Sequence, residues 1–148
     1  MNTKISFLIS LVFAIYFLPH QASAQSKQEW LQIYLNIVGD NKMNGVEASF
    51  QVNTCNGEDM IYIKFVNQND YPVKIEWFDA VFTQASTWIN KEKNSDKKSL
   101  ILAAKAEAKG ECFKKLYPEL CVEEKVFVAD KKDFKRYMAN QLMVTAVQ

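Results

Sequence analysis

Hydrophobic and polar residues alternate along the chain from residue 46 to residue 66. Apolar side chains occupy every second position from Val46 to Val52, with polar ones between them. The alternation returns from Ile61 to Phe65, within a segment that runs from residue 60 to residue 66. This period of two is typical of strands with one buried face. Asn56-Gly57 lies between the segments and predicts a turn.

A third strand is predicted from Val73, after turn-forming residues at 67–72. It begins with strict alternation, but Trp77-Phe78-Asp79-Ala80-Val81-Phe82 is apolar on both faces except at Asp79. An apolar pattern on both faces is typical of a central strand. Beyond it, residues 90–98 are polar and rich in lysine, which predicts a loop. Ser99–Ala103 again favours a strand, and Ala103–Lys109 has the composition of a short helix ending at Gly110.

The remaining segments predict shorter elements. Residues 114–120 form a loop containing Pro118, valines at 122, 126 and 128 indicate a strand, and Asp130 is placed to cap a helical turn within 130–137. Residues 142–147 predict a terminal strand. Residues 30–38 fit two structures. Ser26 to Glu29 resembles a helix capping box, whereas apolar positions 31, 33, 35 and 37 alternate as in a strand. We favour the strand because the rest of the chain is β.

Six to eight short strands, separated by turns every 8 to 12 residues, predict an all-β fold. We expect an antiparallel immunoglobulin-like β-sandwich, with a short helix at most. The stretch from Val46 to Trp77, with Cys55 and the Asn67-Gln68-Asn69 turn, resembles small uncharacterised exported bacterial proteins. Gly110-Glu111-Cys112 is similar in style to the same proteins. The resemblance implies an immunoglobulin-like sandwich and transfers no activity.

Residues 1–24 have the three parts of a cleavable secretory signal peptide. Lys4 supplies the positive charge, an apolar run of about 14 residues follows, and Ala22-Ser23-Ala24 provides the small residues of a cleavage site. That run is shorter than the roughly 20 residues of a spanning helix. We therefore expect residues 25–148 to form one domain, secreted or periplasmic, with no membrane span after cleavage.

Removing the leader changes both the charge and the chemistry of the chain. It takes away Lys4 and His20, so 17 basic and 17 acidic groups remain and no histidine is left. A net charge of zero argues against a nucleic-acid partner. Without histidine, a Ser-His-Asp or Cys-His site and a His-ligated metal site are excluded. We expect no catalytic residues, no metal and no cofactor.

Three cysteines remain in the expected domain, and an oxidising compartment favours one disulfide. We favour Cys55–Cys112, which would join the end of an early strand to a late loop. Cys112–Cys121 would close a local loop and stays open as the alternative. In the favoured pairing, Cys121 is a free thiol of the buried, unreactive kind.

The aromatic residues are the remaining functional indication. Trp77, Phe78, Phe82 and Trp88 lie within 12 residues. If exposed, Trp77, Trp88 and Tyr71 would be candidates for ligand binding, whereas the competing interpretation places such residues in the core. The leading hypothesis is a non-catalytic binding or structural module that acts through protein–protein contacts. The alternative is a carbohydrate-binding module that uses the cluster from Trp77 to Trp88.

Overall fold

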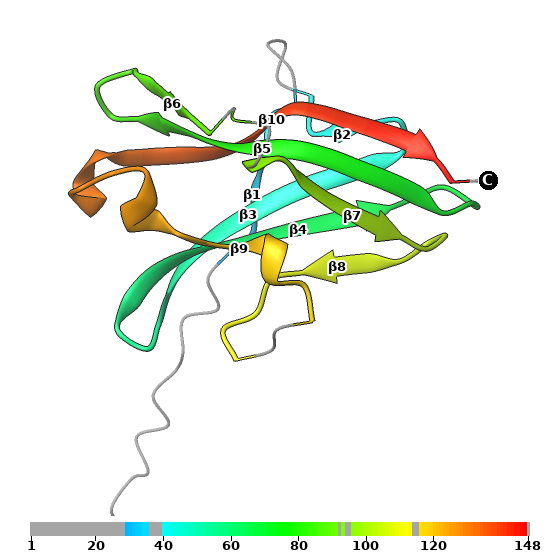
Figure 1. The fold of residues 1–148 in the computed structure, drawn as a ribbon, viewed down its shortest axis with the longest axis horizontal. Coiled ribbons are helices and arrows are strands. Elements are labelled where there is room, and N and C mark those ends of the chain that lie inside the picture. Colours follow the sequence, from blue (N-terminus) through cyan, green and yellow to red (C-terminus); the bar gives the residue numbers. More distant parts are fainter. Residues whose placement is uncertain (1–28, 36–39, 92, 94–95, 114–115, 148) are drawn as a thin grey trace, which may run out of the picture.

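The computed structural model describes residues 29–35, 40–91, 93, 96–113 and 116–147, which form two antiparallel sheets (Figure 1). The predicted leader, residues 1–24, lies outside the described residues. The prediction of an all-β, antiparallel sandwich is confirmed. Ten strands are present rather than six to eight, because the two sheets include several strands of two or three residues. The helices within the described residues are single 3₁₀ turns, and none could cross a membrane.

The six-stranded sheet is built around a long hairpin of β3 and β4. Two further strands pair with β3 on one side, and two pair with β4 on the other. Its members are β1 (Leu31–Gln32), β2 (Lys42–Met43), β3 (Val46–Cys55), β4 (Glu58–Asn67), β8 (Glu107–Lys109) and β9 (Cys121–Glu123).

The four-stranded sheet is built around β5, the doubly apolar strand of the sequence. β10 pairs with one edge of β5, and β6 and β7 share the other edge. In Figure 1, β5 (green) and β10 (red) run side by side over most of their length. Its members are β5 (Val73–Thr83), β6 (Trp88–Asn90), β7 (Lys98–Leu102) and β10 (Phe134–Ala146).

Asparagine-glycine pairs make the two tight hairpins of the six-stranded sheet. Asn56 and Gly57 both have positive φ, 53° and 84°, and Asn44 and Gly45 repeat the pattern at 46° and 76°. Positive φ at both positions is typical of the type I′ turn, whose twist matches that of the paired strands. The predicted turn at Asn56-Gly57 is therefore confirmed.

The core lies between the sheets and is closed by aromatic contacts across them. Phe65 of β4 meets Trp77 of β5 edge to face at 5.0 Å, and Phe50 of β3 lies 6.2 Å from Tyr137 of β10. Ile61, the fifth of these residues, is fully buried on the same face as Phe65, as its alternation predicts.

Three local predictions are wrong. Residues 103–109 form a turn and β8, not a helix, because residues 107–109 pair with β4. The valine-rich segment 122–128 is a strand only to Glu123, and a 3₁₀ turn (η3, Glu124–Val126) follows. The terminal strand begins at Phe134, eight residues before its predicted start at 142. Of residues 30–38, the structure makes a strand of 31–32, and 36–39 lie outside the described residues.

The predicted Cys55–Cys112 disulfide is present, with a Cα–Cα distance of 5.5 Å. It joins the end of β3 to the segment after β8. Cys121 is the free cysteine and is half-buried at the start of β9. The bond closes a loop with a sequence separation of 57 residues. Cross-links over long loops stabilise mainly by restricting the unfolded chain.

Replacing Cys55 and Cys112 together with alanine should lower the free energy of unfolding by about 2–4 kcal/mol, because loop-closure entropy is returned to the unfolded chain. Denaturant unfolding of the mature domain measures the change. Cys121→Ala is the matched control and should have a much smaller effect. Intact-mass analysis should find one alkylatable thiol before reduction and three after it. A stable double variant, or three free thiols without reduction, would contradict this assignment.

Candidate functional site

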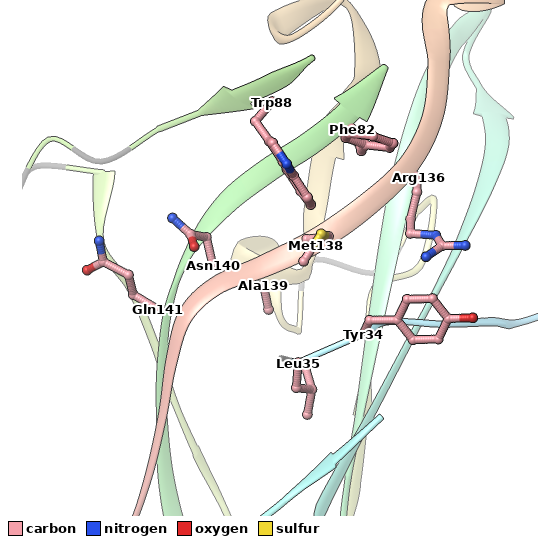
Figure 2. A pocket seen from close by; sticks show the side chains of 9 residues that line it. All are labelled: Tyr34, Leu35, Phe82, Trp88, Arg136, Met138, Ala139, Asn140 and Gln141. Atoms are coloured by element: carbon pink, nitrogen blue, oxygen red, sulfur yellow. The ribbon is translucent and has the colours of Figure 1, made fainter. Parts of the chain in front are cut away.

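A groove of about 500 Å³ lies on the four-stranded sheet, along β10 (Figure 2). Its lining comes from two sides of that strand. Figure 2 shows Trp88, Phe82 and Met138 above β10, with Tyr34 and Leu35 on the segment that passes its other side. The described residues that line it are Tyr34, Leu35, Phe82, Trp88, Arg136, Met138, Ala139, Asn140 and Gln141.

Strand register brings these side chains onto one face. Cross-strand partners point to the same side of a sheet. Arg136 is opposite Phe82 in β5, and Phe82 is in turn opposite Trp88 in β6. Met138 and Asn140 follow Arg136 at the strand period of two and therefore share its face. The outer face of the sheet thus carries an apolar stripe with Arg136 at one end and amide groups at the other.

Trp88 is the most exposed aromatic residue of the groove. Its ring packs on Phe82 with centroids 4.7 Å apart, yet 48% of the residue remains exposed. The ammonium group of Lys135 lies 5.2 Å from the Phe82 ring. A large aromatic side chain that is fixed on one face and open on the other is suited to contact a partner.

The charged groups near the groove are cationic. The guanidinium of Arg136 lies 4.1 Å from the centroid of the Tyr34 ring, a cation–π contact that holds it at the groove. Asp and Glu are absent from the described residues that line the groove. The local potential therefore favours an anionic group on a binding partner.

A β-bulge ends the groove at Gln141. The register shifts by one residue between Asn140 and Met143, and Gln141 has a positive φ of 51°. Before the bulge, the buried residues of β10 are Tyr137 and Ala139, at odd positions; after it, the buried residues are Leu142 and Val144. The extra residue lets both halves of β10 face the core while it turns Gln141 outward.

Beneath the groove, the carboxylate of Asp79 is buried in a polar network between β5 and β10. The Tyr137 hydroxyl donates to its Oδ1 at 2.6 Å, and the Trp77 indole N–H donates to the same oxygen at 3.2 Å. The ammonium group of Lys98 lies 2.7 Å from Oδ2. Lys98 also donates to the carbonyl of Glu119, so the network reaches the 3₁₀ turn η2 (Pro118–Leu120). These bonds fix the backbone of β10 under the groove.

The network perturbs the titration of Tyr137. Burial raises the pKa of the Tyr137 hydroxyl well above its ordinary value of 10.0, and the negative charge of Asp79 raises it further. Glu76, three positions before Asp79, lies instead on the outer face and pairs with Lys74 and Lys97 at 3.1 and 3.2 Å. The two carboxylates therefore point to opposite faces, as the strand period predicts.

The structure separates the three aromatic residues predicted as ligand-binding candidates. Trp77 is fully buried against Phe65, so its assignment as a ligand-binding residue is wrong: the inward face of a central strand must fill the core. Trp88 is exposed in the groove. Tyr71 is also 48% exposed, but it precedes the start of β5, whereas Trp88 pairs near the end of that strand. The structure therefore does not bring Tyr71 and Trp88 together.

Sequence reasoning did not find the contribution of β10 to the site. Residues 130–137 were interpreted as polar with a helical turn, which left Arg136 and Met138 without an assigned face. The turn is present as η4 (Lys131–Asp133), and the backbone N–H of Lys132 donates to the Asp130 carboxylate at 3.0 Å. The alternation of Tyr137 and Ala139 was a usable signal, but the bulge at Gln141 changes its parity and hides it.

Comparison with known proteins gives little further information. No family model matches the chain, and no curated protein is similar to it. Among solved structures, it is similar to a DUF1425 family member from Shewanella sp. pv-4, with 10% identity and a TM-score of 0.43. The match covers 70% of this chain and 79% of that one. That protein is an uncharacterised bacterial protein, and it transfers no activity to this chain.

The titration of Tyr137 predicts a loss of stability in alkali. The unfolded chain ionises this tyrosine near pH 10, whereas the folded chain keeps the proton, so the contribution is complete below pH 10 and is lost as the pH rises above it. While only the unfolded state is ionised, the free energy of unfolding falls by about 1.4 kcal/mol per pH unit for one such group. Tyr137→Phe should remove this slope.

The same variant should lower stability at neutral pH by about 1.5–3 kcal/mol, because a hydrogen bond to a buried carboxylate is lost. Denaturant titrations between pH 7 and pH 11 measure both effects. The exposed Tyr71→Phe is the matched control and should leave both the slope and the neutral-pH stability unchanged. An unchanged alkaline slope in Tyr137→Phe would show that Tyr137 does not control it.

Proposed function

We propose that this protein is an exported, non-catalytic binding module that acts through protein–protein contacts in the periplasm or at the cell surface. The contact surface is the groove along β10, which we call the Trp88 groove after its exposed aromatic residue. The observation that carries the proposal is the exposure of Trp88 within an apolar, cation-flanked groove of about 500 Å³.

The composition of the Trp88 groove supports a protein partner of defined chemistry. Tryptophan, tyrosine and arginine are enriched among the residues that dominate protein interfaces. Here Trp88, Tyr34 and Arg136 line one groove, together with the adaptable side chain of Met138. Because its flanking charges are positive, we infer a partner segment that presents apolar side chains beside a carboxylate.

The support beneath the groove favours a preformed surface. Asp79 and Tyr137 link β5 to β10 through a buried hydrogen bond, and the Arg136–Tyr34 contact fixes the cation at the groove. A surface that is ordered before binding loses less conformational entropy on association. This suits a module whose contribution is affinity, with no bond to make or break.

Export is supported by two independent features. Residues 1–24 have the composition of a signal peptide, and the Cys55–Cys112 disulfide is of the kind that persists in oxidising compartments. The carbohydrate alternative in its original form, with a platform from Trp77 to Trp88, is weakened because Trp77 is buried.

Trp88→Ala should weaken partner binding by at least about 30-fold, the effect of truncating a central interface aromatic by roughly 2 kcal/mol. A photo-crosslinking residue at Met138 in the exporting cell identifies the partner, and titration calorimetry with the purified partner measures affinity. Ile101→Ala is the matched control: Ile101 is 64% exposed on β7 of the same sheet and does not line the groove.

The Ile101→Ala variant should bind like the wild type and unfold at the same denaturant concentration as Trp88→Ala, within about 0.5 kcal/mol. Equal binding by both variants would place the contact surface elsewhere. Loss of binding in both would show that the effect is not specific to the Trp88 groove.

A further inference from the structure

A second cleft, of about 250 Å³, lies on the outer face of the six-stranded sheet. It shares no lining residue with the Trp88 groove among the described residues. Tyr62 of β4 lies opposite Gln51 in β3 and opposite Cys121 in β9, so neighbouring strands surround it. Trp30, just before β1, and Lys109, at the end of β8, also line the cleft. We call it the Tyr62 cleft.

The hydroxyl of Tyr62 is buried without a hydrogen-bond partner. The residue is only 3% exposed, and its oxygen contacts no donor or acceptor of the described residues. Buried polar groups are nearly always paired, because an unpaired one has lost its water without compensation. A buried, unpaired hydroxyl in the lining of a cleft is therefore explained by a ligand that supplies the missing partner.

The other polar groups of the cleft describe the charge of that ligand. Gln51 and Asn53 provide amides, each of which both donates and accepts hydrogen bonds. The one cation and the one anion among the described lining residues, Lys109 and Glu111, pair with each other at 3.6 Å. A cleft with balanced charges and mixed donors and acceptors is complementary to a neutral molecule rich in hydroxyl groups.

An aromatic residue completes the cleft. The Trp30 indole lines it, and the ammonium group of Lys64 lies 4.8 Å from the centroid of that ring and holds the side chain against the sheet. The apolar C–H face of a sugar ring packs well on an aromatic surface, while its hydroxyls reach polar neighbours. Of the aromatic residues considered for sugar binding, Trp30 thus has the polar surroundings that the Trp77–Trp88 cluster lacks.

The far wall of the cleft is held close to the sheet. The disulfide ties Cys112 to the end of β3, and the N–H of Gly110 donates to the Ile63 carbonyl at 2.9 Å. A β-carbon at Gly110 would lie 2.3 Å from the Leu120 carbonyl oxygen, so only glycine allows this approach. The cleft is therefore built from fixed backbone, as a selective site requires.

We propose that the Tyr62 cleft binds one sugar unit of a neutral carbohydrate, with the Tyr62 hydroxyl bonded to a sugar oxygen and the Trp30 ring against the sugar face. Burial raises the pKa of Tyr62 above 10.0, and the neighbouring Cys121 raises it further, so the hydroxyl remains protonated and able to donate at neutral pH. The site is independent of the Trp88 groove.

The test uses the mature domain labelled with ¹⁵N, whose three tryptophan indole N–H signals report on separate places. The probes are methyl glucoside, methyl mannoside, methyl galactoside and N-acetylglucosamine, each titrated to about 10 mM, followed by oligosaccharides of the unit that binds. The Trp30 signal should shift and saturate, while those of Trp77 and Trp88 stay in place. A stronger effect of the oligosaccharide would identify a polymer as the source of the sugar unit. No shift of Trp30 with any probe would overturn the proposal.

Tyr62→Phe separates a ligand-binding hydroxyl from a structural one. It should weaken binding of the active probe about tenfold and leave the unfolding midpoint unchanged or raised, because it removes a buried group that has no partner in the protein. Tyr71→Phe is the matched control and should change neither quantity. A lower midpoint for Tyr62→Phe, or probe binding equal to that of the wild type, would contradict the assignment. Neither result would affect the partner contact at Trp88.

Discussion

One buried carboxylate organises the four-stranded sheet. Asp79 accepts hydrogen bonds from Tyr137 and Trp77 and pairs with Lys98, so a single side chain links β5, β10 and β7. A buried charge of this kind is tolerated only when its partners are all present. Trp77 and Tyr137 in turn pack across the core against Phe65 and Phe50. The polar network and the aromatic core therefore depend on the same four aromatic rings and hold the two sheets in one relative position.

The outer surfaces follow from that inner arrangement. Because Tyr137 must face Asp79, its neighbours Arg136 and Met138 must face outward, next to Phe82 and Trp88. On the opposite sheet, Tyr62 is directed outward by the burial of its neighbours on β4, and the disulfide-linked segment covers it. The domain thus presents two unlike surfaces, one apolar and flanked by cations, the other polar and balanced in charge. We assign the first to a protein partner and the second to a neutral sugar unit.

The reliable sequence predictions were those in which a local pattern and the tertiary environment agree. β3, β4 and β5 have the period expected of their burial, and Asn56-Gly57 has the backbone preference that its turn requires. Predictions failed where pairing overrides local preference, as at β8, whose Ala- and Lys-rich sequence favours a helix but completes the edge of a sheet. β10 was missed for a different reason, since its bulge reverses the alternation halfway along the strand.

The sequence by itself determined the fold class, the strands with strict alternation, and a chemistry without histidine beyond residue 20, because these depend on composition and on neighbouring residues. It favoured the correct cysteine pair without excluding the other. Only the tertiary structure decided which aromatic residues are exposed. Trp77 and Trp88 are similar in sequence context, but one lies inside a central strand and the other on a short edge strand. The difference arises from strand pairing between distant segments, which no local pattern records.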